Sequence, residues 1–164
     1  MKYIPFVLYL FLIGFYRTLL VDSLAIGGAQ IYLTALIVIL LSLNKNYLTA
    51  LWFGFAAGIV IDALTPAFLG VQIIILSLIG IGAAQAKERF NLESLKSLIL
   101  LVAIGLIAFS IPYQIIYVTS GASEFGGVLL RSTIPSIIYT LVVAWLYFLI
   151  HLGRISFKKL KTLF

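Results

Sequence analysis

The chain contains no cysteine and one histidine, and only 10% of its 164 residues are charged. The absence of cysteine excludes disulfides and thiolate metal sites. His151 has no second histidine and no carboxylate close to it in the sequence, so we expect no metal site and no other cofactor. With 63% hydrophobic residues and a mean hydropathy of +1.22, the composition also excludes an ordinary soluble domain.

Motifs for catalysis are missing as well. The glycine pairs Gly27-Gly28 and Gly126-Gly127 are isolated, and neither forms a glycine-rich phosphate loop. An intramembrane protease needs two acids, or a serine and a histidine, at matched depth, and the sequence offers neither pair. We therefore expect no enzymatic activity.

Six apolar stretches are separated by polar or turn residues, at about 3–21, 27–43, 47–63, 67–86, 95–119 and 127–152. Roughly 20 apolar residues cross a bilayer core as a helix. The sequence therefore predicts an all-α integral membrane protein, a bundle of six transmembrane helices over residues 1–152. The second and third stretches are short for full spans, so either they cross nearly upright or one is partly re-entrant. We interpret residues 3–21 as a retained helix, because they are long and lack a small-residue cleavage site.

The basic residues predict the orientation of this bundle. With the N-terminus inside, nine cations fall on the inner side and two, Arg17 and Arg131, on the outer side. The nine are Lys2, Lys45, Lys87, Arg89, Lys96, Arg154, Lys158, Lys159 and Lys161. This asymmetry follows the positive-inside rule and predicts that both termini are cytoplasmic.

The tail at 153–164 combines cations with Phe157, Leu160 and Phe164. This mixture is typical of a short helix on an anionic inner leaflet, and we expect anionic lipid to bind there. A plain positive-inside anchor is the simpler alternative.

The segment 47–86 runs for forty residues with a single charge, Asp62. Ala50, Gly54, Gly58 and Asp62 recur every four residues, which places them on one helix face. Small residues at this spacing allow two helices to approach closely, so we predict a helix-packing or partner interface here. Asp62 itself has two readings: a member of a polar cluster, or an acid that caps the following helix.

Five charges gather toward the predicted outer side: Arg17, Asp22, Asp62, Glu124 and Arg131. Asp22 and Glu124 fit loop positions, whereas Arg17 and Arg131 lie inside apolar stretches. Our hypothesis is that Asp62 pairs with Arg17 or Arg131 and holds the first, third and sixth helices in register. The alternative for both arginines is snorkelling to the headgroups.

The sequence Gly54-x3-Gly58-x3-Asp62, followed by Leu69-Gly70-Val71, resembles the central motif of the MreD family of rod shape-determining proteins. The length, the six predicted crossings, the inner termini and the basic tail also agree with that family. The resemblance implies a fold similar to the substrate-binding subunits of energy-coupling-factor transporters. It also implies that Gly54, Gly58, Asp62, Leu69 and Gly70 belong to the helix-packing or partner interface.

The resemblance further implies a function: a non-enzymatic scaffold in the bacterial cytoplasmic (inner) membrane, acting in cell elongation and peptidoglycan synthesis. Its expected partner is an MreC-like protein with one membrane helix, which connects it to MreB filaments, RodA and the partner transpeptidase of RodA. The alternative is a small-molecule-binding membrane subunit of a vitamin-type transporter. Such a subunit needs an enclosed outer cavity with convergent polar groups.

The predicted topology can be tested by labelling intact cells. Because the chain has no native thiol, single cysteines at Lys45 and Ser123 each give one reactive site. A membrane-impermeant maleimide should label position 123 and spare position 45 until the cells are opened. Labelling of both positions, or of neither, from outside would contradict the topology.

Overall fold

The computed structural model describes residues 4–21, 23–25, 29–65, 70–89, 95–119 and 133–161. Within these residues the chain forms six α-helices and one π-helical segment, and so the prediction of an all-helical fold is confirmed. The elements are α1 (Ile4–Phe15), η1 (Tyr16–Leu20), α2 (Leu33–Ser42), α3 (Tyr47–Leu64), α4 (Val71–Arg89), α5 (Leu95–Thr119) and α7 (Ile134–Lys161).

Two of the helices follow the apolar stretches closely, whereas α2, α4 and α7 differ from them. α4 runs from Val71 to Arg89, where 67–86 was predicted, and α7 begins at Ile134, where 127 was predicted. α3 and α5 begin and end within a residue of their predicted limits. α2 begins at Leu33 instead of near residue 27 and has only 10 residues, a length of about 15 Å. α7 continues to Lys161 and therefore includes part of the predicted tail.

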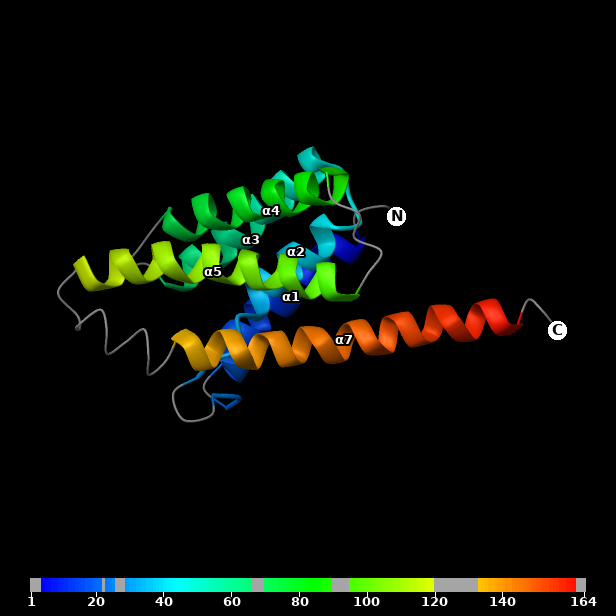
Figure 1. Cartoon of the computed structure of the whole chain (residues 1–164). Helices are drawn as coiled ribbons and strands as arrows, with labels where there is room; N and C mark the ends of the chain where they lie inside the picture. The colour runs from blue at the N-terminus through cyan, green and yellow to red at the C-terminus, as the bar shows by residue number, and fades with distance from the viewer. Residues whose placement is uncertain are drawn as a thin grey trace.

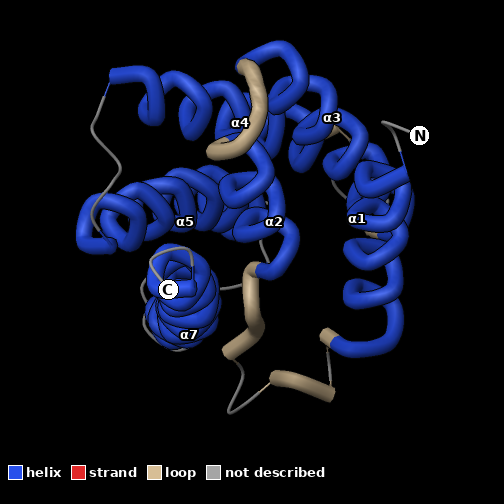
Figure 2. Tube along the Cα trace, turned by 90° about the vertical axis from the view of Figure 1, so that its right-hand side faces the viewer, coloured by secondary structure: helices blue, strands red, loops and turns tan. Residues whose placement is uncertain are grey.

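The shortest helix lies at the centre of the bundle. Figure 2 shows α2 surrounded by α1, α3, α4, α5 and α7, and α2 contacts each of these helices. Val38 and Ile39 of α2 are completely buried. They share the hydrophobic core with Leu76 of α4 and with Val102 and Leu106 of α5.

The chain direction alternates so that most described charges gather at one end. The start of α1, the turn between α2 and α3, the end of α4 and the start of α5 lie at the same end of the bundle (Figure 1). At this end the Lys45 ammonium lies 5.7 Å from the centroid of the Phe6 ring. Lys87, Arg89 and Lys96 are also exposed here, as the charge distribution predicts for one membrane face.

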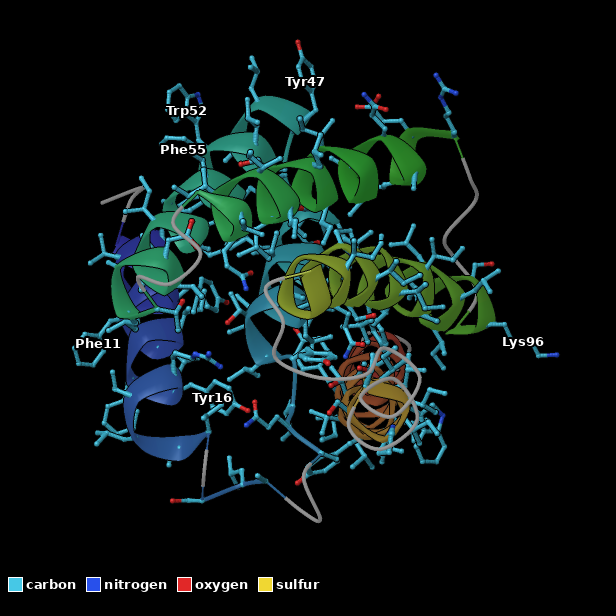
Figure 3. The ribbon with its side chains drawn as sticks, turned by 90° about the vertical axis from the view of Figure 1, so that its left-hand side faces the viewer. Phe11, Tyr16, Tyr47, Trp52, Phe55 and Lys96 are labelled. Atoms are coloured by element: carbon cyan, nitrogen blue, oxygen red, sulfur yellow. The ribbon has the colours of Figure 1, made fainter. Side chains whose placement is uncertain are left out.

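Within the described part of the chain, two helices, α3 and α4, are long and apolar enough to cross a membrane. Large apolar side chains are also exposed on several faces: Phe11 of α1 is 74% exposed, Trp52 of α3 65% and Leu100 of α5 62%. Figure 3 shows Phe11, Trp52 and Phe55 directed away from the bundle, whereas Tyr16 is directed inward. Apolar exposure over so many helices is unusual for a soluble monomer.

The residues that precede α2 run in a non-helical conformation and bond to side chains of other helices. The Gln30 N–H donates to Ser136 Oγ at 2.8 Å, and the Tyr32 N–H donates to Thr140 Oγ1 at 2.9 Å. The Tyr16 hydroxyl, carried by the π-helical segment, donates to the Ile31 carbonyl at 2.8 Å. Non-helical backbone inside an apolar bundle requires such partners, and these bonds explain why α2 begins later than predicted.

Thr140→Val tests the importance of these bonds. The substitution keeps the shape of the side chain but leaves the partly buried Tyr32 N–H without this acceptor, which should destabilise the protein by about 1–3 kcal/mol. The measurement is thermal or denaturant unfolding in detergent. Thr18→Val is the matched control, because the exposed Thr18 hydroxyl donates only to carbonyls of its own turn. Equal stability of the two variants would contradict the assignment.

Candidate functional site: the α3–α4 hairpin

The small residues of α3 lie directly against the backbone of α4. A β-carbon on Gly54 would lie 2.8 Å from the Leu76 carbonyl carbon, and one on Gly58 would lie 2.7 Å from the Ile73 nitrogen. Real β-carbons essentially never approach a backbone atom to within 3.0 Å. Each of these positions therefore accepts only glycine unless the helices separate.

The contact is reciprocal, because a glycine of α4 lies against the backbone of α3. A β-carbon on Gly80 would lie 2.7 Å from the Ala50 carbonyl oxygen, and Ala50 is completely buried. Ser77 and Ala84, which share this side of α4, are buried as well. The four-residue spacing therefore marks an interface between consecutive helices of the same chain. Gly54 and Gly58 are covered by α4 and leave no free surface for a partner.

Asp62 ends the small-residue face and caps the start of α4. Its side chain is 2% exposed. Oδ2 accepts hydrogen bonds from the N–H groups of Gly70 at 2.9 Å and Ile73 at 3.2 Å, and Oδ1 accepts one from Gln72 at 3.3 Å. These amides belong to the first turn of α4, where N–H groups have no partner within the helix. The carboxylate also interacts favourably with the positive end of the helix dipole.

Gly70 explains why the cap comes from another helix. The residue at the start of a helix usually supplies the capping oxygen from its own side chain. Gly70 has no side chain, and its φ of +91° is a conformation that other residues rarely adopt. Asp62, eight positions earlier on α3, supplies the oxygen instead. Of its two readings, the structure shows Asp62 as a helix cap.

The predicted polar cluster is not assembled around Asp62 within the described residues. Arg17 is partly buried on η1, and no ion pair joins it to Asp62 in the part of the chain that the structure describes. Arg131 and Leu69 lie outside the described residues, so their predicted roles stay predictions. Asp22 and Glu124 also lie outside them, and nothing is described of the His151 side chain.

The hydroxyls of Ser136 and Thr140 were not predicted from the sequence to bond to another segment. Their spacing of four residues, which places them on one face of α7, was the signal that could have identified them.

Two further polar side chains are buried at the same end of the bundle as Asp62. Gln114 Nε2 of α5 donates to Thr133 Oγ1, whereas the Oε1 atoms of Gln72 and Gln114 have no hydrogen-bond partner among the described residues. No group of three potential ligands among His, Cys, Asp and Glu gathers within the described residues.

Comparisons of this chain with protein-family models, with curated proteins and with solved structures gave no match.

Two glycine substitutions test the α3–α4 contact against a matched control. Gly58→Ala places a methyl group against the α4 backbone and should destabilise the protein by roughly 1–3 kcal/mol. Gly82→Ala adds the same methyl group to α4, where nothing lies within 4 Å, and should be neutral or stabilising by up to about 1 kcal/mol. Unfolding in detergent measures both. Similar effects at the two positions would contradict close contact at Gly58.

Substitutions of Asp62 and Arg17 separate the cap from an ion pair. Asp62→Ala leaves the amides at the start of α4 without their acceptor, and Asp62→Asn keeps one oxygen. We expect a loss of about 1–3 kcal/mol for alanine and a smaller loss for asparagine. Arg17→Met should have little effect on unfolding. An ion pair would give a different result: Arg17→Met alone would cost as much stability as the Asp62 substitution. Added to a protein in which Asp62 is already replaced, Arg17→Met would then cause no further loss.

Proposed function

We propose that this chain is a non-enzymatic membrane scaffold of the bacterial cell-elongation machinery, similar to MreD. The observation that carries the proposal is the α3–α4 hairpin. The residues of the MreD-like motif that the structure describes, Gly54, Gly58, Asp62 and Gly70, all act in this one unit. The motif therefore has a structural role in packing and capping the hairpin, which supports a scaffold.

The proposed location is the bacterial inner membrane, with six crossings and both termini in the cytoplasm. Two candidate spans and the exposed apolar side chains of α1, α3, α5 and α7 support it. The gathering of Lys45, Lys87, Arg89 and Lys96 at one end of the bundle supports the orientation.

A scaffold also needs a surface on which a partner helix can pack. The internal interface covers the glycines of α3, but the opposite side of α3 exposes Leu48, Trp52 and Ile59. In lipid, a bound helix gains mainly from close packing and hydrogen bonds, because lipid tails are as apolar as the helix. The proposed partner is a protein of the MreC type with a single membrane helix, which links the scaffold indirectly to MreB, RodA and its transpeptidase.

A second candidate function is a small-molecule-binding subunit of a vitamin-type transporter. The unpartnered Oε1 atoms of Gln72 and Gln114, each on a side chain that is 6% exposed, favour it. Buried acceptors without partners are uncommon and often mark a site for water or a ligand. Asp62, however, already binds three backbone amides and is not available to a ligand.

Co-purification from the source bacterium distinguishes the two functions. The tagged chain, extracted in mild detergent, should bring with it the MreC-type protein of the host in stoichiometric amount, and depletion of the chain should turn rods into spheres. Gly82→Ala should retain the partner, whereas Gly58→Leu, which separates α3 from α4, should lose it.

Three results would contradict the scaffold proposal. The first is unchanged cell shape on depletion. The second is equal recovery of an unrelated single-helix membrane protein. The third is recovery of paired ATPases with a coupling subunit, which would support the transporter function instead.

A further inference from the structure

An apolar groove runs between α4 and α5, which lie side by side in Figure 1. Its volume is about 590 Å³, within the range of about 300–1,000 Å³ that ligand sites occupy. Completely buried Ile39 of α2 forms its floor, and exposed Leu78 and Ile104 form its two rims. Gly82 leaves one wall open, because nothing lies within 4 Å of the place where its β-carbon would be.

The groove has the depth of one membrane leaflet. Its α4 wall extends from Ala86, next to the charged end of the bundle, to Ile75. At 1.5 Å per residue these eleven steps span about 16 Å. The hydrocarbon core of a bilayer is about 30 Å thick, so one leaflet accounts for about 15 Å. The α4 wall thus matches one leaflet, and the longer α5 wall, from Ser97 to Pro112, spans about 22 Å. The groove is therefore long enough for the part of an acyl chain that lies within one leaflet.

Cations of α4 and α5 lie near the charged end of the groove. Arg89 follows Gly82 and Ala86 along one side of α4, and Lys96 precedes Leu100 and Ile104 along one side of α5. Both cations are exposed, as is neighbouring Lys87, and Figure 3 shows Lys96 extended away from the bundle.

The one described acid nearby does not share this side of α4. Glu88 follows Gly80 and Ala84, and these residues belong to the side of α4 that faces α3. Among the described residues, the charges near the open end of the groove are therefore mainly those of Lys87, Arg89 and Lys96.

We propose that this groove binds an anionic phospholipid of the inner leaflet. One acyl chain lies along Gly82 and Ile104, and the headgroup phosphate lies among Lys87, Arg89 and Lys96. A partner helix would account for the apolar groove but not for cations at one end, and a neutral lipid would gain little from them. Basic sites between helices at the cytoplasmic side suit anionic headgroups. The inference rests on the membrane location proposed above and not on the identity of any protein partner.

Native mass spectrometry of the intact purified chain tests the site. The chain is loaded with phosphatidylglycerol or with phosphatidylcholine of the same acyl length, and the bound lipid is counted as collision energy rises. The wild-type chain should retain one phosphatidylglycerol under conditions that remove phosphatidylcholine. The triple variant K87Q/R89Q/K96Q should bind it more weakly, by about fivefold per cation and on the order of 100-fold in all.

Two further variants locate the lipid. Gly82→Phe fills the groove without changing charge and should abolish retention, and circular dichroism checks that the variant stays folded. K158Q/K159Q/K161Q removes the same charge from the tail and should leave the retained lipid in place. A loss with the tail variant but not with K87Q/R89Q/K96Q would overturn the site.

Other occupants give other results. Equal retention of the two lipids would overturn the proposal in favour of a neutral occupant. A dimer that Gly82→Phe dissociates would assign the groove to a second copy of the chain. Because the assay contains no partner protein, its outcome is independent of the scaffold proposal.

Discussion

The hydrogen bonds from the first turn of α4 to the Asp62 carboxylate hold the hairpin on which the bundle is built. A buried carboxylate is costly in an apolar environment unless its oxygens are bonded, and the first amides of a helix are costly unless they find acceptors. The Asp62 carboxylate supplies the acceptors that the α4 amides need, and these amides supply the donors that the carboxylate needs. The glycines at 54 and 58 then allow the two backbones to touch along their length. Neither feature suffices alone, because the cap fixes the register of the helices and the glycines fix their separation.

The non-helical segment before α2 is the second place where backbone groups inside the bundle need hydrogen-bond partners, and there the partners are neutral. Before α2, the hydroxyls of Tyr16, Ser136 and Thr140 bond to the non-helical segment, and no charge is involved. Both solutions direct polar groups inward and leave apolar side chains on the outside, which is the arrangement that a lipid environment favours. The groove between α4 and α5 lies outside these two regions, which leaves it free for an occupant without disturbing either set of hydrogen bonds.

The parts of this fold that local patterns control could be predicted from the sequence. The long apolar runs gave the bounds of α3 and α5, and four-residue spacing placed Gly54, Gly58 and Asp62 on one face. The start of α2 could not be predicted, because its partners lie in α7 and in the π-helical segment, far away in the sequence. The partner of Asp62 was equally hidden, since an arginine and a free helix end can both satisfy a buried acid. The φ of Gly70 and the distances to the α4 amides show the helix cap, whereas Arg131 lies outside the described residues.

The bonds between the segment before α2 and α7 also bear on how the protein is made. Ser136 and Thr140 are synthesised 106 and 108 residues after the backbone groups they bind. At about 5–20 residues per second, roughly 5–20 s pass at the ribosome before these acceptors exist. During this interval the N–H groups of Gln30 and Tyr32 need water or another acceptor, so α2 cannot reach its final position until α7 has been synthesised. Assembly of this bundle therefore finishes only once α7 is in place, and a chain truncated before α7 should stay incompletely packed around α2.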